Sequence, residues 1–473
     1  MNAAPTAPSA TQGTHAERLA AFAVRAAYET MSTEAREQMK IRVLDSLGCA
    51  IGALDADPIK RIRRYIDDMD QDGPCSLLGM ARRTAPDRAA FYNSALVRYL
   101  DFNDSYMSAG DYAHPSDNFG PVLAAGEFAG AHGRDFLAAL ALAYQVQTRL
   151  VDVAPVLDKG FDHTVQGSYA VAAGASRMLG LDVPRTANAI AMAGTAFNAL
   201  RVTRTGRLSH WKGLAYANTA FGCLHAAMLA RQGITGPAEV FEGNKGFMHT
   251  IAGCFEIDWK KEDLEAVTRT SIKKYNGTID AQSSIETALA LRARLGGDVA
   301  KILSLELDVF DIAFRVIGGG EEGDKHIVTT KEEADHSLPY MVAVALLDGV
   351  MTPAQYAPDR LARPDVQALL RRVSVRSDRA FSDRFPDEVG SRLRAVLEDG
   401  REARAESRDY EGYRSRPMGW AAAMSKFEAL ASPRLREGGA AAIVDGVRHL
   451  DSMDVATFLA VVNGAIVPSE AGQ

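Results

Sequence analysis

Cysteine is scarce in this 473-residue chain, and its four residues, Cys49, Cys75, Cys223 and Cys254, lie far apart. No Cys-x-x-Cys pair and no ladder of histidine and cysteine occurs, which argues against zinc and iron–sulfur sites. The pattern favours four reduced, mostly buried thiols in a cytoplasmic protein.

Long apolar runs are also missing. No stretch of about 18 uninterrupted apolar residues exists, so we expect no membrane span. Residues 1–15 are rich in Ala, Pro, Ser and Thr and lack the basic and apolar regions of a secretory signal, so we expect them to be disordered. The net charge of −7 gives no support for a nucleic-acid partner, although a local basic cluster for a small anion is still allowed.

The common fingerprints of nucleotide-binding and hydrolase folds are absent too. The sequence has no Gly-x-Gly-x-x-Gly and no Gly-x-Ser-x-Gly. The Gly318-Gly319-Gly320 run lacks the Lys-Ser/Thr pair of a phosphate-binding loop, and we interpret it as a flexible connector.

The length predicts two or three domains, and a composition of 47% hydrophobic and 24% charged residues is typical of soluble globular proteins. Apolar residues recur at three- and four-residue spacing over 16–267, which predicts a large all-helical domain. Alternating residues at 303–309, 373–375 and 392–397, with Asp399-Gly400 as a hairpin turn, predict a smaller α+β lid domain over 268–415. Residues 416–473 return to a helical pattern and are expected to pack on the first domain. The predicted fold class is therefore mainly α.

Short groups of polar residues, here called polar islands, interrupt the otherwise apolar sequence. They are His114-Pro-Ser-Asp, Asp162-His163-Thr, Ser209-His210-Trp-Lys212 and Asp335-His336-Ser. Taken singly, each also fits a capped helix or a solvated cluster. Lys212 precedes a run of small residues, and a buried lysine needs a partner or a task. We expect it to pair with a substrate carboxylate, or with Asp101 or Asp104.

Six short motifs, in this order, resemble the MmgE/PrpD family of 2-methylcitrate dehydratases, which also contains cis-aconitate decarboxylase and an iminodisuccinate epimerase. The motifs are Leu-Asp-Phe-Asn-Asp, His-Pro-Ser-Asp-Asn, Gly-Phe-Asp-His, Ser-His-Trp-Lys-Gly, Ile-Lys-Lys-Tyr and Ala-Asp-His-Ser-Leu-Pro-Tyr. The resemblance, which spans roughly residues 16–462, implies a helical domain and an α+β lid with a cleft between them. It also implies a homodimer and no metal or other cofactor.

One position departs from the family pattern. Dehydratase-like members often carry histidine where this chain has Asp280, so a potential cation becomes an anion. If Asp280 contacts the substrate, the resemblance alone does not imply that the chain accepts 2-methylcitrate.

The resemblance and the polar islands together predict a lyase that dehydrates 2-methylcitrate or a similar hydroxy acid with several carboxylates. The residues expected to carry the chemistry are His114, His163, Lys212, Asp101 and Tyr340, with the histidines as acid and base in undecided order. The residues expected to bind substrate are Ser105, Lys273, His210, Asp280 and His336. Decarboxylation or epimerisation of a related polycarboxylate is the alternative, and a non-catalytic helical paralogue with scattered polar islands is the third hypothesis.

Overall fold

The computed structural model describes residues 13–69 and 72–468. Most of the predicted disordered segment lies outside these residues. Its last residues, however, are ordered, because Thr14 caps the first helix, α1 (His15–Arg25), and forms a capping box with Glu17. The expectation of disorder is therefore wrong for Thr14 and His15.

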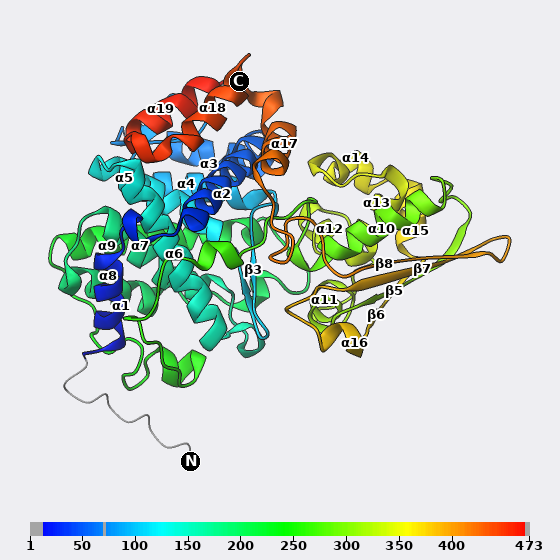
Figure 1. The fold of residues 1–473 in the computed structure, drawn as a ribbon, viewed down its shortest axis with the longest axis horizontal. Helices are drawn as coiled ribbons and strands as arrows, with labels where there is room; N and C mark the ends of the chain where they lie inside the picture. Colours follow the sequence, from blue (N-terminus) through cyan, green and yellow to red (C-terminus); the bar gives the residue numbers. More distant parts are fainter. Residues whose placement is uncertain (1–12, 70–71, 469–473) are drawn as a thin grey trace.

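Helices dominate the first half of the chain, which forms the large left-hand body of Figure 1. The other α-helices of this part are α2 (Thr33–Gly52), α3 (Asp57–Asp68), α4 (Pro86–Tyr99), α5 (Phe119–Ala129), α6 (Gly133–Val153), α7 (Thr164–Met178), α8 (Val183–Ala196) and α9 (Trp211–Arg231). Single turns η1 (Tyr28–Thr30), η2 (Pro115–Asn118), η3 (Leu157–Lys159), η4 (Arg201–Thr203), η5 (Met248–Ala252) and η6 (Ala266–Arg269) connect them. One continuous apolar core, rich in alanine, lies between these helices.

Two short antiparallel strand pairs interrupt this region, which the periodicity predicts as purely helical. They are β1 (Cys75–Ser76) with β2 (Arg83–Thr84), and β3 (Tyr106–Met107) with β4 (Tyr112–Ala113). The second pair matters for function, because Ser105 and His114 sit at its base. Ser105 also exchanges two backbone hydrogen bonds, of 2.8 and 2.7 Å, with Ser271 from the far end of the helical region.

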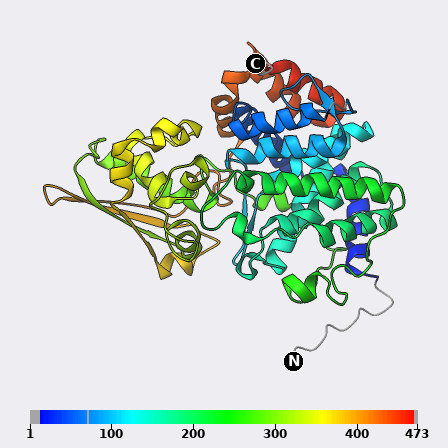
Figure 2. The same ribbon diagram turned by 180° about the vertical axis from the view of Figure 1, so that it is seen from behind.

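The last three helices return to the large body, where Figure 2 shows them beside the N-terminal helices. They are α17 (Trp420–Ala431), α18 (Gly439–Arg448) and α19 (Val455–Ala465), with turns η9 (Ser432–Arg434) and η10 (Leu450–Ser452). Their apolar residues belong to the same core as those of α1 to α9. We call α1 to α9 with α17 to α19 the large domain.

The intervening residues form a smaller α+β domain with its own apolar core. Its helices are α10 (Gln282–Arg294), α11 (Asp311–Ile317), α12 (Lys331–Ala334), α13 (Leu338–Asp348), α14 (Pro358–Leu361), α15 (Pro364–Leu370) and α16 (Arg379–Ser382), with turns η7 (Ile279–Ala281) and η8 (Pro353–Tyr356). Its strands are β5 (Ile302–Val309), β6 (Val373–Ser377), β7 (Ser391–Leu397) and β8 (Glu402–Ser407), in the spatial order β6-β5-β7-β8. The predicted mainly-α class with a smaller α+β region is confirmed.

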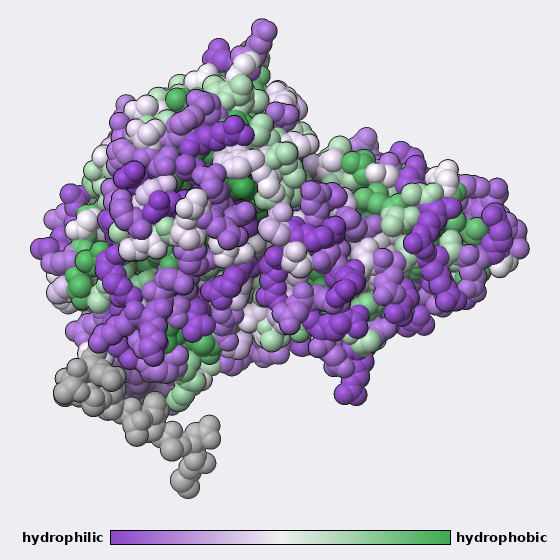
Figure 3. Space-filling view, viewed as in Figure 1, coloured by the Kyte–Doolittle hydropathy of each residue, from purple (hydrophilic) through white to green (hydrophobic). Residues whose placement is uncertain are grey.

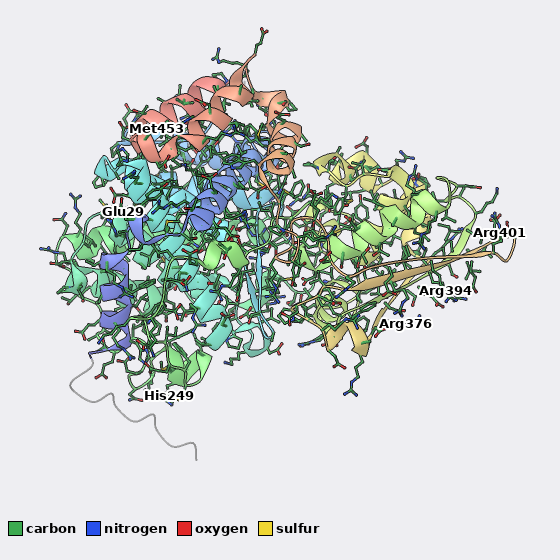
Figure 4. The ribbon with its side chains drawn as sticks, viewed as in Figure 1. Glu29, His249, Arg376, Arg394, Arg401 and Met453 are labelled. Atoms are coloured by element: carbon green, nitrogen blue, oxygen red, sulfur yellow. The ribbon has the colours of Figure 1, made fainter. Side chains whose placement is uncertain are left out.

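Alternation along the strands explains why this sheet forms. On β7 every second side chain from Ser391 to Leu397 is buried, and helices cover that face. The opposite face carries ion pairs, among them Arg376 with Glu306 at 3.2 Å and Arg394 with Glu306 at 3.0 Å. Figure 4 labels these two arginines on the sheet of the small domain, with Arg394 farther from the large domain than Arg376. Gly400 has a φ of +79°, as the predicted Asp-Gly hairpin turn requires.

Figure 3 shows the side of the molecule that faces the viewer in Figure 1. Hydrophilic residues cover most of it, with scattered apolar spots. Among the residues that the structure describes, no helix combines the length and the apolar character needed to cross a bilayer.

Candidate active site

A buried carboxylate, that of Asp101, lies where the two domains meet. Arg98 donates to its Oδ1 at 2.7 Å and Lys273 to the same oxygen at 2.6 Å, while Lys212 donates to Oδ2 at 3.0 Å. Asp101 lies two residues after the end of α4 and has a φ of +55°, a left-handed conformation that is uncommon outside glycine. Such backbone strain is typical of functional sites, and here it turns the carboxylate toward three cations.

The charges around Asp101 determine its protonation. Burial alone would raise the pKa of Asp101, but Arg98, Lys273 and Lys212 outweigh it and hold the pKa well below its usual value. Burial also lowers the pKa of Lys273 to about 8, although Asp101 partly offsets the effect. The carboxylate is therefore charged at neutral pH, and the Lys273 ammonium loses its proton only slightly above it.

Asp335 supplies a second carboxylate from the small domain. Lys212 forms a short ion pair with its Oδ1, and Lys331 lies 2.6 Å from its Oδ2. His336 Nδ1 is 3.1 Å from the same carboxylate and 3.6 Å from Asp101. Lys212, on α9 of the large domain, thus joins acidic residues from both domains.

His114 lies close to this cluster, and within 13–69 and 72–468 only one of its ring nitrogens has a hydrogen-bond partner. Its Nδ1 is 2.9 Å from the carbonyl oxygen of Asp104 and 2.7 Å from the hydroxyl of Ser105. Because a carbonyl oxygen can only accept, we assign the proton to Nδ1, which leaves the lone pair of Nε2 available. Burial, together with the positive charges of Arg98, Lys273 and His163, lowers the pKa of His114 well below its ordinary value. The ring is neutral at physiological pH and can accept a proton.

His163 faces His114 across 5.1 Å between ring centroids. Two carboxylates flank it: Asp162 lies 3.0 Å from Nδ1 and Asp117 lies 3.7 Å from Nε2. Arg98 Nε is 3.7 Å from Asp117, so a continuous chain of charged contacts runs from His163 to Asp101. The non-catalytic hypothesis requires scattered polar islands, whereas the structure brings His114 and His163 together.

The Asp280 side chain is buried in η7, just before α10, and neither of its oxygens has a hydrogen-bond partner among the residues that the structure describes. Burial raises the pKa of Asp280 to about 7, although the positive charges of Lys273 and Arg201 oppose the shift. An unpaired buried carboxyl is costly, which marks this residue as a candidate for contact with a ligand.

Two predicted residues lie apart from the cluster. The hydroxyl of Tyr340 donates to the carbonyl of Gln355 inside the small domain. His210 is exposed and lines an outer groove between α3 and α9, next to Trp211. Neither is brought to Asp101, and we leave both out of the proposed machinery.

Sequence reasoning did not assign Arg98, Asp335, Lys331 or Arg201 to the site. The sequence does contain a signal for Arg98, because an arginine on an otherwise apolar helix, three residues before Asp101, suggests a buried ion pair. Arg201 and Lys331 each have a partner in the other domain: Arg201 binds Glu322 at 2.6 Å, and Lys331, besides pairing with Asp335, binds the carbonyl of Tyr99 at 2.5 Å. Spacing alone does not reveal such contacts.

Asp101, Asp335 and His336 are, within 13–69 and 72–468, the one group of ligating side chains close enough together to hold a cation. Their oxygens already bind Lys212, Lys273 and other basic groups at hydrogen-bond distance. A divalent cation would meet ammonium groups at close range, so the donor set does not suit a metal.

Comparison with known proteins identifies the family of this chain. The MmgE/PrpD N-terminal domain matches residues 17–260 and the MmgE/PrpD C-terminal domain matches residues 275–452. A mitochondrial 2-methylcitrate dehydratase of Yarrowia lipolytica is 27% identical over 396 residues, which is 79% of this chain and 75% of the relative. The 2-methylcitrate dehydratase of Cupriavidus necator is 27% identical over 399 residues, 79% of this chain and 80% of the relative. The cis-aconitate decarboxylase of Mus musculus is 24% identical over 454 residues, 92% of this chain and 90% of the relative. With both family domains matched along most of its length, the chain belongs to the MmgE/PrpD family.

Proposed function

We propose that this chain is a lyase that removes water from 2-methylcitrate or a similar hydroxy polycarboxylate, by acid–base chemistry of its own side chains and without a cofactor. The observation that carries the proposal is the neutral His114, with a free Nε2, beside a buried cluster of cations. The dehydratase relatives support the same reaction class.

The first step is proton removal. His114 Nε2 takes the proton from the carbon next to a substrate carboxylate, and negative charge develops on that carboxylate. Lys212 and Lys273 each use two of their three N–H groups on the protein, so each has one left for the substrate. Their fixed position lets them stabilise the developing charge without reorganisation.

The second step is loss of the hydroxyl. His163, held between Asp162 and Asp117, donates a proton to the leaving oxygen, which departs as water. Asp101 contributes by positioning Lys212 and Lys273. Asp280, in its protonated form, donates a hydrogen bond to a further substrate carboxylate, because a charged Asp280 would repel a polyanion.

Decarboxylation is the second candidate. It is favoured by the extent of the match to the mouse cis-aconitate decarboxylase, which covers more of this chain than the matches to the dehydratases do. The same basic cluster would hold the remaining carboxylates while carbon dioxide leaves. Epimerisation needs only removal and return of one proton, and the histidine pair could do that as well.

One substrate panel separates these reactions. The purified protein is incubated in heavy water with 2-methylcitrate, citrate, cis-aconitate and substituted succinates. Alkene formation is followed by absorbance, carbon dioxide by a coupled assay and deuterium by NMR. Dehydration gives an alkene without carbon dioxide, decarboxylation gives carbon dioxide, and epimerisation gives deuterium incorporation without loss of water. No turnover of any of these acids would contradict the proposal. The homodimer and the cytoplasmic location stay predictions.

A further inference from the structure

A cavity of about 370 Å³ lies between the domains beside the cluster around Asp101. Residues of the large domain after η4 form one wall, and residues before, within and just after α12 form the other. Its lining residues are Gly206, Arg207, Leu208, Asp324, Lys325, Ile327, Thr329, Glu333 and Ser337. The volume falls in the range of sites for small molecules.

The acidic residues of this cavity already have partners. Asp324 binds the backbone and the ring of its neighbour His326, both at 2.9 Å. Glu333 accepts from Thr329 and Thr330 and closes the capping box of α12. These two carboxylates are therefore already paired, and their contacts stabilise the local loop.

The basic residues of the cavity have no such partner. Lys325 is only 6% exposed, and its Nζ makes no hydrogen bond or ion pair with any residue in 13–69 or 72–468. Arg207 is exposed and likewise lacks a hydrogen bond or ion pair within the described chain. Glu322, the carboxylate that attracts Lys325, is bound to Arg201. The Lys325 side chain is mostly buried while its ammonium is unpaired, so an anion in the cavity would form a charge-assisted hydrogen bond with it.

The cavity also adjoins the catalytic cluster electrostatically. Burial lowers the pKa of Lys325, and the positive charges of Arg201 and Lys212 lower it further. Ser337, which lines the cavity, directly follows His336 of the cluster and donates to the Lys325 carbonyl at 2.5 Å, which ties Lys325 to the cluster. Positive charge gathered in this way attracts anions and steers them inward.

We propose that this cavity is a carboxylate-binding site at the outer end of the active site, in which Lys325 and Arg207 hold one carboxylate of the substrate as it approaches Lys212. The assignment rests on the proposed function, because it takes the ligand to be a small acid with two or three carboxylates. A separate anionic effector with the same chemistry is the other source of such a ligand, and the test distinguishes the two.

The test compares Lys325→Met and Arg207→Met with wild type, and with Arg64→Met as a matched control. Arg64 is an exposed arginine on α3 without a hydrogen bond or ion pair among the described residues. We expect kcat/KM to fall roughly 10- to 100-fold in the first two variants, since a charge-assisted hydrogen bond contributes on that scale. The decrease of kcat/KM between 20 and 200 mM salt should also become shallower, while the control keeps wild-type values.

Equilibrium binding of propane-1,2,3-tricarboxylate, measured by calorimetry, keeps this inference separate from the reaction. One equivalent binding to wild type and at least tenfold weaker to both variants supports the site, even if no acid of the panel is turned over. A second equivalent that binds beside the first would identify an effector site and overturn the capture role. Unchanged affinity in Arg207→Met, which replaces an exposed side chain and should fold normally, would overturn the assignment outright. No binding to wild type would remove both this site and the proposed function.

Discussion

At the scale of single residues, the site is an arrangement of groups whose pKa values burial and neighbouring charges have shifted. His114 is kept neutral, Asp101 is kept charged, and Lys273 and Asp280 titrate near pH 8 and 7. Clusters of perturbed groups are typical of active sites. The combination gives one neutral base next to fixed positive charge, which is what proton removal beside a carboxylate requires.

The pH dependence of kcat/KM follows from these shifts. A protonated Asp280 is required, so kcat/KM should fall as pH rises through about 7, and fall more steeply above about 8 as Lys273 loses its charge. On the acid side the rate should stay level to about pH 6, because the pKa of His114 lies well below its ordinary value. Asp280→Asn keeps a neutral donor and should remove the first decrease, leaving only the one near pH 8.

A pH profile of kcat/KM from 5.5 to 9 checks this expectation. The direction in which kcat/KM changes near pH 7 is the critical result, because a charged Asp280 that accepts a hydrogen bond from substrate would make kcat/KM rise through pH 7. A rise in wild type, or an unaltered decrease near pH 7 in Asp280→Asn, would contradict the assigned role.

Some of this site could be predicted from sequence because the residues break a local pattern. Lys212 stands before a run of small residues and proves to be buried, and His114 and His163 begin polar islands and lie face to face. Of the partners predicted for Lys212, namely a substrate carboxylate, Asp101 or Asp104, the structure shows Asp101. Its second partner, Asp335, lies 123 residues away, and no spacing rule reaches that far. Tyr340 carries a motif position, but its hydroxyl is used inside the small domain.

At the scale of elements, the structure shows which of the predicted strands form and which strands were not predicted. Strands β5 and β7 and the hairpin at Gly400 follow from alternation and from the Asp-Gly turn, and they form as predicted. The pair β3 and β4 was missed, because strands of two residues are too short to show a period. Its place at the site depends on the contact of Ser105 with Ser271, which is a tertiary feature.

The seam between α6 and the C-terminal helices gives a test at this scale. Gly133 begins α6 and donates to the carbonyl of Met453 at 2.8 Å. A Cβ at Gly133 would lie 1.8 Å from the backbone oxygen of Leu450, so Gly133→Ala must displace the chain between α18 and α19. We expect a loss of about 1–3 kcal/mol in the free energy of unfolding and a lower thermal midpoint.

Gly464→Ala is the matched control for this experiment. Gly464 lies in α19 with open space around its Cβ position, so alanine should leave the protein as stable or slightly more stable. Thermal unfolding followed by circular dichroism measures both variants. If Gly133→Ala unfolds at the wild-type temperature, the C-terminal helices do not pack against α6 as described.

At the scale of the whole molecule, charged side chains connect the two domains at the site. Lys212 binds Asp335, Lys331 binds the Tyr99 carbonyl, and Arg201 binds Glu322, each across the domain boundary. Each domain has its own apolar core, while the contacts named here between the domains are made by charged side chains close to Asp101. The cluster is therefore complete only when the two domains are in contact, which explains why the polar islands are spread along the sequence.

The most direct test of this account is the turnover of 2-methylcitrate, followed by alkene formation and by NMR, in wild type, His114→Gln and Lys212→Met. Both variants should keep the wild-type circular dichroism spectrum and lose about 10²–10⁴-fold in kcat, the usual contribution of a positioned acid or base. Wild-type turnover should persist after treatment with a chelator, since the acidic groups are bound to lysines. Folded variants with kcat within about threefold of wild type, or turnover that disappears on chelation and returns with a metal ion, would contradict a site run by His114 and the buried cations.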